Sequence, residues 1–277
     1  NGVLGRALRD RTVLEAHRLD APAYRRPTAA TTFEGRDRFA PAAGWIARGT
    51  PLRRFGAAVD RPTIGPPAPR LEPGRPAMVP VIHVDRFEST GGFGSAEELN
   101  KRLAEHILSH PTLGDERTTT HGMDTGEILD SDDPAILALI ENVRRAVNRM
   151  AAGLDLEPDH PFMQGRPERW YLTGWGVRMW RGGFQIPHYH QDAWISGVYY
   201  VQLPAAVSSS DESQQGWIEF GQGPDDIFQQ STAPTRRIAP EEGRLIAFPS
   251  YFWHRTLPFE DDQERLCISF NLVPADE

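Results

Sequence analysis

The sequence has almost no cysteine, and it lacks any long apolar run. Cys267 is the only cysteine among 277 residues, which excludes an intrachain disulfide and a zinc site made of cysteines alone. A membrane-spanning helix needs about 20 consecutive apolar residues, and no stretch approaches that length. One cysteine is also compatible with a reducing compartment. We therefore expect a cytoplasmic protein that does not enter a membrane.

Lysine is nearly absent as well, because Lys101 is the only lysine among 30 basic residues. The arginines are concentrated near the N-terminus. Residues 1–77 hold 14 arginines and seven acidic residues, a balance of +7, so the other 200 residues carry −15 of the total charge of −8. An acidic remainder of this size provides no basic groove for a phosphate backbone, which argues against a nucleic-acid substrate.

Residues 1–77 also contain ten of the 24 prolines and only one short helix-like stretch, from Val3 to Leu19. Such a segment buries too little apolar surface to offset the entropy of ordering it. We expect residues 1–77 to be a poorly ordered Arg- and Pro-rich extension ahead of a folded part that begins at Met78. The alternative is a basic arm that binds nucleic acid or an anionic surface.

The folded part, residues 78–277, opens with local patterns for one strand and two helices. The alternation from Val79 to Phe87 predicts a strand. Ser95-Ala-Glu-Glu98 is a capping box for a helix that ends near Ser109, and Asp133-Pro134 begins a second helix that ends at Gly153. These elements form the predicted helical support, residues 95–154.

From residue 169 to residue 275 the pattern changes to short strands separated by Gly, Pro, Ser and Asp turns. This rhythm predicts an antiparallel sandwich or barrel, and hence an α+β chain that is mainly β. The predicted strands are Trp170 to Arg181, Ile195 to Leu203, Gly216 to Phe220, Thr235 to Ile238, Arg244 to Phe248 and Leu266 to Val273.

Potential metal ligands gather in the middle of this β-rich part. His188, His190 and Asp192 occupy alternate positions, which point the same way in an extended chain. A second apolar strand is followed by His254, and a third begins at Arg265. Imidazole and carboxylate groups are both common ligands of metal ions in proteins. The spacing therefore predicts a metal site in the barrel.

Together these motifs resemble a known family. Pro-His188-x-His190 with Ser-Gly-Val-Tyr-Tyr-Val201, then Gly-x-Leu-x-x-Phe-Pro-Ser-x-x-x-His254 and Arg265 with Ser-Phe-Asn271, are similar to the 2-oxoglutarate- and iron(II)-dependent oxygenases of bacteria and phages. The resemblance covers roughly residues 79–275. It implies the double-stranded β-helix, the jelly-roll barrel of the prolyl-hydroxylase superfamily, with Fe(II) and 2-oxoglutarate as cofactors.

The resemblance leaves the ligand set open. In the superfamily a His-x-Asp/Glu pair and a distal histidine hold iron, but here the position two beyond His188 is a histidine. Either His188, His190 and His254 form a three-histidine site, or His190, Asp192 and His254 form the usual triad. His188 and Asp192 lie about 13 Å apart in an extended strand, so both cannot bind one ion. We favour the three-histidine set.

The resemblance also implies a place for 2-oxoglutarate. An arginine about ten residues past the distal histidine binds its far carboxylate in the superfamily, and Arg265 lies 11 residues past His254. Tyr200 matches a position that offers a phenol to the same carboxylate. We expect Ser269 on the same strand face as Arg265, and Tyr199 on the opposite side from Tyr200.

These residues imply a dioxygenase that hydroxylates a C–H bond of a small molecule or a protein side chain and converts 2-oxoglutarate to succinate. A three-histidine dioxygenase that does not use 2-oxoglutarate and a non-catalytic barrel that senses a small acid are the alternatives. The sequence does not identify the substrate or the oligomeric state. Four tryptophans near the motifs are candidates for the pocket wall: Trp180, Trp194, Trp217 and Trp253.

Overall fold

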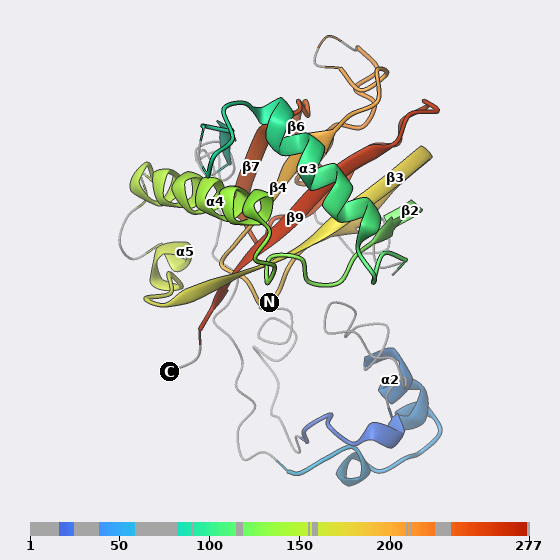
Figure 1. Cartoon of the computed structure of the whole chain (residues 1–277). Helices are drawn as coiled ribbons and strands as arrows, with labels where there is room; N and C mark the ends of the chain where they lie inside the picture. The colour runs from blue at the N-terminus through green and yellow to red at the C-terminus, as the bar shows by residue number, and fades with distance from the viewer. Residues whose placement is uncertain are drawn as a thin grey trace. The chain divides into compact units, whose positions relative to one another are not determined.

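The computed structural model describes residues 17–24, 39–58, 82–89, 91–114, 119–154, 156, 160–208, 210, 212–224 and 234–275. The chain divides into two compact units, an N-terminal unit of residues 1–75 and a C-terminal unit of residues 76–277 (Figure 1). Most of the helix-like stretch predicted from Val3 to Leu19, and the start of the strand predicted from Val79, lie outside the described residues. No helix among the described residues is long and apolar enough to cross a membrane.

The N-terminal unit contains three short helical elements in its described part: η1 (Pro22–Tyr24), α2 (Ala40–Ala47) and η4 (Leu52–Arg54). They pack through aromatic side chains. Phe55 is buried, and the ring of Tyr24 lies 4.6 Å from that of Phe55 and 5.7 Å from that of Trp45. The sequence does not predict α2, because eight residues that include a glycine and a proline have no polar face to reveal a helical period.

The C-terminal unit is built on a nine-stranded antiparallel sheet. The strands follow the order β1-β7-β4-β9-β3-β8-β5-β6, with β2 paired to β3 outside this path. Their bounds are β1 (His83–Arg86), β2 (Thr119–Asp124), β3 (Trp170–His188), β4 (Ile195–Gln202), β5 (Ile218–Phe220), β6 (Arg236–Ile238), β7 (Arg244–Pro249), β8 (His254–Thr256) and β9 (Arg265–Pro274).

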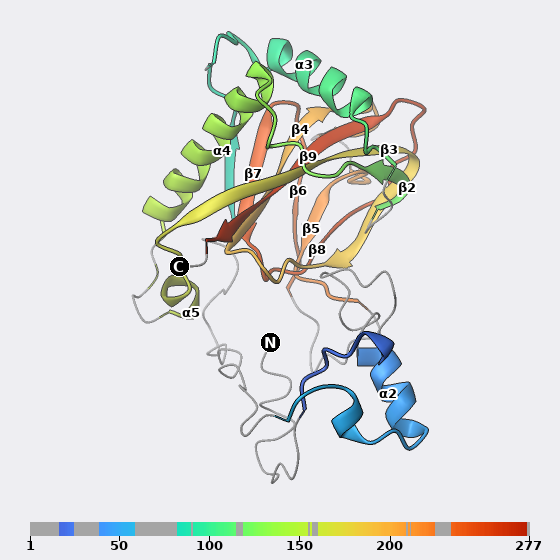
Figure 2. The same ribbon diagram turned by 60° about the horizontal axis from the view of Figure 1, so that its bottom comes forward.

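The sheet curls because the 19-residue strand β3 belongs to two halves of it. Residues 170–179 of β3 pair with β9, whereas Gln185 and His188 pair with Thr256 and His254 of β8. The result is a larger half, β1-β7-β4-β9-β3, and a smaller half, β3-β8-β5-β6, which face each other in Figure 2. This curled sheet confirms the predicted double-stranded β-helix.

Helices α3 (Ala96–Ser109) and α4 (Pro134–Ala152) cover the outer face of the larger half (Figures 1 and 2). Both begin as their caps predict: the Ser95 hydroxyl accepts a hydrogen bond from the Glu98 amide, and the Asp133 carboxylate accepts one from the Ala135 amide. Leu99, Leu103 and Ile107 of α3 are fully buried. Their period of four residues is what places one apolar stripe of the helix on the sheet.

Close contact between this stripe and the sheet depends on a glycine in β3. A Cβ built at Gly176 would lie 3.0 Å from two side-chain carbons of Ile107, closer than ordinary packing allows. The helices thus seal the outer face of the larger half and leave its inner face toward the cavity of the barrel. Alternate residues of β4 and β9 divide between these two faces.

The two helices and six strands predicted between residues 95 and 275 are confirmed, and four features extend or correct the prediction. Strand β3 continues to His188 instead of ending at Arg181, so the first histidine belongs to a strand. Strands β2 and β8 and the short helix α5 (Pro161–Gln164) are not predicted. Three to six residues are too few for a periodic pattern, and β8 forms because it pairs with β3 and β5.

The division of the chain near residue 76 generates a first prediction. A chain that starts at Met78 should keep a cooperative melting transition and bind metal like the full chain, because the buried side chains of the barrel and of α3 and α4 all lie beyond that point. Calorimetry and metal analysis of the shortened and full-length chains test this. Loss of the transition in the shortened chain would mean that residues 1–77 are part of the fold.

Candidate metal centre

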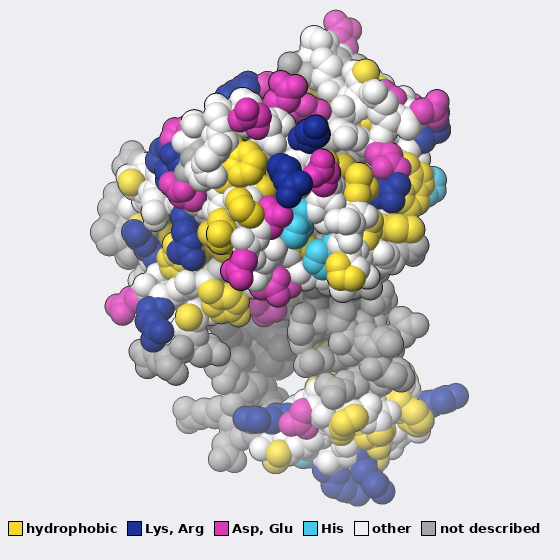
Figure 3. Space-filling view, in the orientation of Figure 1, with side chains coloured by type: hydrophobic (Ala, Val, Ile, Leu, Met, Phe, Trp, Pro, Cys, Tyr) yellow, Lys and Arg dark blue, Asp and Glu magenta, His cyan; other side chains and the backbone are white. Residues whose placement is uncertain are grey.

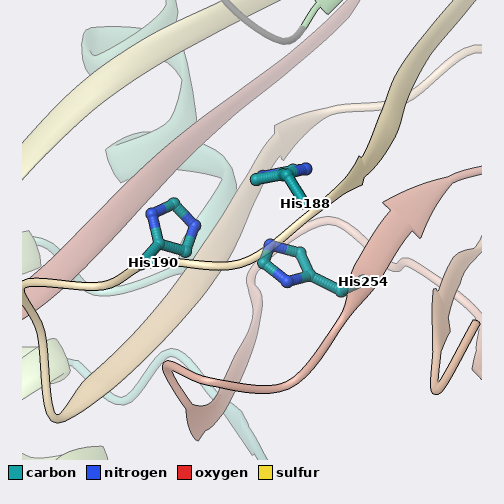
Figure 4. Close-up of side chains that lie close together, drawn as sticks. All are labelled: His188, His190 and His254. Atoms are coloured by element: carbon teal, nitrogen blue, oxygen red, sulfur yellow. The ribbon is translucent and has the colours of Figure 1, made fainter. Parts of the chain in front are cut away.

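Three histidines converge at one end of the barrel, where the smaller half of the sheet meets the larger. His188 is the last residue of β3, His190 follows two residues later, and His254 begins β8 (Figure 4). His188 and His254 are paired across the two strands, so their side chains leave the same face. One ligand nitrogen from each histidine lies within 4.8 Å of the other two, and no other such group occurs among the described residues.

Backbone carbonyls fix the orientation of two of the rings. The Nδ1 atom of His188 lies 2.7 Å from the carbonyl oxygen of Ile186, and that of His254 lies 2.9 Å from the carbonyl oxygen of Phe252. A carbonyl can only accept a hydrogen bond, so Nδ1 carries the proton in both rings and Nε2 keeps its lone pair. In metal-binding histidines, a hydrogen bond from the nitrogen that does not bind the metal orients the ring and sets its tautomer.

Burial keeps the three imidazoles neutral. It lowers the pKa of His188 below its ordinary value, lowers that of His254 well below it, and lowers the pKa of His190 to about 3, the last with a further contribution from neighbouring His188. A metal ion needs the unprotonated ring nitrogen. The site therefore presents three neutral nitrogen donors near neutral pH.

Asp192 lies outside this group. It is exposed, in the bend between His190 and the start of β4, and its carboxylate does not belong to the set of converging ligand atoms among the described residues. The chain bends at Gln191 and Asp192, so alternation along a strand no longer applies there. An aspartate in such a bend is also a common turn former.

Arg265 opens β9 and is almost completely buried, with 2% of its surface exposed. Its Nη1 atom donates a hydrogen bond of 2.6 Å to the carbonyl oxygen of Gly216, and its guanidinium lies 5.3 Å from the ring centre of Tyr200. The Nε atom has no hydrogen-bond partner among the described residues. A buried cation with an unpaired hydrogen-bond donor destabilises the folded protein unless an anion binds to it.

Tyr200 faces the same space. Its hydroxyl is buried without a hydrogen-bond partner among the described residues, and burial raises its pKa, an effect that the charge of Arg265 only partly offsets. Tyr199 points to the other side of β4, where its hydroxyl donates to the Asn100 side chain of α3. This confirms the predicted opposite orientation of the two tyrosines.

The histidines, Tyr200 and Arg265 line one cavity. Cys267 and Ser269 line it too, at alternate positions of β9 after Arg265, and burial raises the pKa of the Cys267 thiol. The other lining residues are Trp175, Gln185, Gly197, Val198, Ile218, Phe248 and Thr256. The cavity thus joins a cluster of neutral nitrogen donors to a cationic end, which suits a metal ion and a small carboxylate that reaches from one to the other.

The wall residues Trp175, Gln185 and Thr256 are not predicted from the sequence. Trp175 faces His190, with ring centres 5.8 Å apart, and Thr256 lies within 3.4 Å of the Gln185 side chain. Thr256 follows His254 by two residues in a strand and therefore shares its face, a relation that alternation would have revealed had β8 been recognised. For Trp175, alternation along β3 predicts that the side chain points into the barrel, but it does not predict that the ring lies level with His190.

None of the four candidate tryptophans belongs to the described wall of this cavity. Trp194 stacks on the Phe162 ring at 4.9 Å, Trp253 packs against Tyr189 at 4.7 Å, and the Trp217 indole donates to the Ser208 carbonyl. Those side chains are used for packing at the ends of strands.

A buried carboxylate braces the strand that carries His254. Glu219 of β5 is 1% exposed and accepts hydrogen bonds from Arg255 of β8, at 2.7 Å, and from Arg237 of β6, at 2.5 Å. Its neighbour Phe220 is paired with His254. The two ion pairs therefore join the three strands of the smaller half beside the distal histidine.

Comparison with known proteins agrees with this arrangement. Residues 173–271 match the model of a family described as "Putative 2OG-Fe(II) oxygenase". The matched segment includes the three histidines, Tyr200 and Arg265. No curated protein matches the sequence.

Among solved structures, similarity is found to a Pseudomonas putida prolyl-4-hydroxylase, with 15% identity, 71% of this chain and 94% of the other covered, and a TM-score of 0.46. The viral collagen prolyl hydroxylase of Paramecium Bursaria Chlorella virus-1, in its 2-oxoglutarate complex, has 13% identity, coverage of 70% and 97%, and a TM-score of 0.45. HygX from Streptomyces hygroscopicus, with nickel and 2-oxoglutarate bound, has 12% identity, coverage of 70% and 83%, and a TM-score of 0.45. Residues 173–271, which include the three histidines and the buried arginine, thus match the 2-oxoglutarate/Fe(II) oxygenase family that the motifs resemble.

Proposed function

We propose that this protein hydroxylates a C–H bond of a small molecule or a protein side chain and converts 2-oxoglutarate to succinate in the same reaction. One observation carries the proposal: a single cavity holds three converging neutral imidazoles and, at its other end, a buried arginine whose Nε lacks a partner among the described residues. The first set fits Fe(II) and the second fits a carboxylate.

In this proposal His188, His190 and His254 bind the iron. Their nitrogens are close together, and two of the rings are held by carbonyl groups that keep the Nε2 lone pair available. Three protein ligands on one side leave the remaining coordination positions open, as non-haem oxygenases require. Fe(II) bound there would allow oxygen to oxidise two molecules: 2-oxoglutarate would take up one oxygen atom and lose carbon dioxide to give succinate, and the C–H bond of the substrate would take up the other oxygen atom as a hydroxyl group.

The second set of residues binds 2-oxoglutarate. Arg265 offers its guanidinium to the far carboxylate, Tyr200 adds its hydroxyl, and Ser269 lines the cavity on the same face of β9. A planar guanidinium matches a carboxylate through two parallel hydrogen bonds. The opposite end of the molecule then lies toward the histidines. The protein's share of the chemistry is to hold the two ends, orient the substrate and exclude water.

The described surface gives little support for a nucleic-acid substrate. On the face of the C-terminal unit shown in Figure 3, described acidic and basic side chains are interspersed. Several of the arginines are neutralised in pairs, such as Arg178 with Glu264 and Arg149 with Asp85. Phosphate backbones are bound by unneutralised basic patches, so small molecules and protein side chains are the better candidates.

Turnover separates this proposal from its two alternatives. With Fe(II), ascorbate and oxygen, the protein should convert 2-oxoglutarate slowly to succinate even without its substrate, and His254→Ala should reduce this to background. Mass spectrometry of succinate provides the measurement. Tight binding of 2-oxoglutarate without any succinate would favour a sensor, and absence of binding would favour a three-histidine dioxygenase that uses another substrate.

The ligand set generates a second prediction. If the three histidines bind iron, His188→Ala should lose most of the metal while Asp192→Ala keeps it, because the Asp192 carboxylate lies outside the group. If His190, Asp192 and His254 are the ligands, these two outcomes exchange. His190→Ala and His254→Ala should lose iron in either case.

Metal analysis of the four purified variants measures this, with His83→Ala as the control. His83 is bonded to Asp85 on the edge strand β1 and does not belong to the cluster. Full iron content in both His190→Ala and His254→Ala would refute the oxygenase proposal itself.

A third prediction concerns the carboxylate end. Arg265→Ala removes one partner of a buried charged pair, a loss of about 2–5 kcal/mol, so the Kd for 2-oxoglutarate should rise roughly 30-fold or more. Iron content should not change, since Arg265 does not belong to the histidine cluster. Titration calorimetry without oxygen provides the measurement.

Arg178→Ala is the matched control for this variant. Arg178 lies on β3, where it is paired with the residue that follows Arg265 on β9. It forms an ion pair with Glu264 and does not line the cavity. Its replacement should leave the Kd for 2-oxoglutarate unchanged. Equal affinities of Arg265→Ala and the unaltered protein would remove Arg265 from the site.

A further inference from the structure

The buried guanidinium of Arg265 is held by a backbone group from a distant segment. Gly216 lies in the turn that precedes β5, 49 residues before Arg265, and its carbonyl oxygen accepts the 2.6 Å hydrogen bond from Nη1. This hydrogen bond is buried, and the Nε atom of the same guanidinium has no partner among the described residues. The carbonyl dipole also offsets part of the buried positive charge. One side of the guanidinium is thereby fixed while Nε stays available.

The conformation at position 216 requires glycine. Its φ is +68°, in the left-handed region that side chains with a Cβ rarely adopt. A Cβ built there would lie 2.7 Å from one methyl of Val207, which is buried, and 3.4 Å from Nη1 of Arg265 itself. Any other residue must therefore move the carbonyl, the valine or the guanidinium.

The turn around Gly216 is tied to the barrel on both sides. The Gly216 amide donates to the Pro258 carbonyl at 3.3 Å, and the Leu257 amide donates to the Trp217 carbonyl at 2.9 Å. Immediately afterwards the chain enters β5, where Ile218 lines the cavity. The position of the Gly216 carbonyl is thus set by the strands of the smaller half, whereas Arg265 comes from the larger half.

We propose that Gly216 is a positioning residue for 2-oxoglutarate: its carbonyl holds one side of the Arg265 guanidinium so that the other side faces the carboxylate. This rests on the proposed function of Arg265. A guanidinium that is not held can rotate about its side-chain bonds, and part of the binding free energy is then spent on ordering it. The turn before β5 therefore sets the affinity for the co-substrate without touching it.

The test is the affinity of Gly216→Ala for 2-oxoglutarate, measured by titration calorimetry of the iron-loaded protein without oxygen. Losing the placement of a charge-assisted hydrogen bond should raise the Kd roughly tenfold. The Kd for Fe(II) should stay unchanged, because Gly216 does not belong to the histidine cluster. A general loss of structure would weaken both affinities together, so the split between them identifies a positioning role.

Gly91→Ala is the matched control. Gly91 also has a positive φ, +61°, and a Cβ there would lie 2.8 Å from the Cβ of Ala138 on α4, far along the chain from either set of site residues. Backbone strain and crowding are therefore similar to those of Gly216→Ala. This variant should melt at a lower temperature and bind 2-oxoglutarate like the unaltered protein.

Arg265→Lys provides a second measurement that leaves the turn intact and can still overturn the proposal if Gly216→Ala does not fold. A lysine keeps the charge but cannot bind the Gly216 carbonyl and a carboxylate through one planar group, so its Kd should rise as well. Unchanged affinity in Arg265→Lys, or in a folded Gly216→Ala, would overturn the role of Gly216. Unchanged affinity in Arg265→Ala would instead overturn the proposed function of the arginine.

Discussion

The site depends on one strand that pairs in two directions. The first part of β3 is bonded to β9, which carries Arg265, and its end is bonded to β8, which carries His254. The same 19 residues thus fix the distance between Arg265 and the histidine cluster. Pairing of this kind is set by backbone hydrogen bonds, and a shift of one residue would turn every inward side chain outward. His188 lies where this strand ends and is paired directly with His254.

Local patterns in the sequence predict most of the helices and strands of the C-terminal unit but not the cavity. The caps at Ser95 and Asp133 and the alternation in β4 and β9 act within a few residues, and the structure follows them. The histidine pair 188 and 190, His254 and Arg265 could also be selected, because their spacing is a property of single segments. Their convergence could only be inferred from the resemblance, since it depends on which strands pair.

What could not be predicted depends on contacts between distant segments. Strand β8 has three residues and exists because β3 and β5 flank it. Gly216 looks like any loop glycine until its carbonyl is seen next to Arg265. For Asp192 the sequence suggests a role that the structure does not support. Its spacing from His190 fits a metal ligand, but the chain bends there and leaves the carboxylate exposed. Spacing along the sequence predicts a shared face only while the strand continues.

A site without a carboxylate ligand has a different charge from the usual triad. Three neutral imidazoles leave bound Fe(II) with its full two positive charges, and Arg265 adds a third at the other end of the cavity. Dianionic 2-oxoglutarate would neutralise two of these three charges. In a triad with one aspartate the iron, the aspartate and the arginine would sum to two positive charges, and the same dianion would neutralise both. Charges interact more strongly in a buried cavity than in water. The positive charges at the iron and at Arg265 would therefore both strengthen the binding of the dianionic 2-oxoglutarate. In the proposed function 2-oxoglutarate is the missing partner of this buried arginine, and at a free concentration one hundred times the Kd such a ligand stabilises the folded state by about 2.7 kcal/mol.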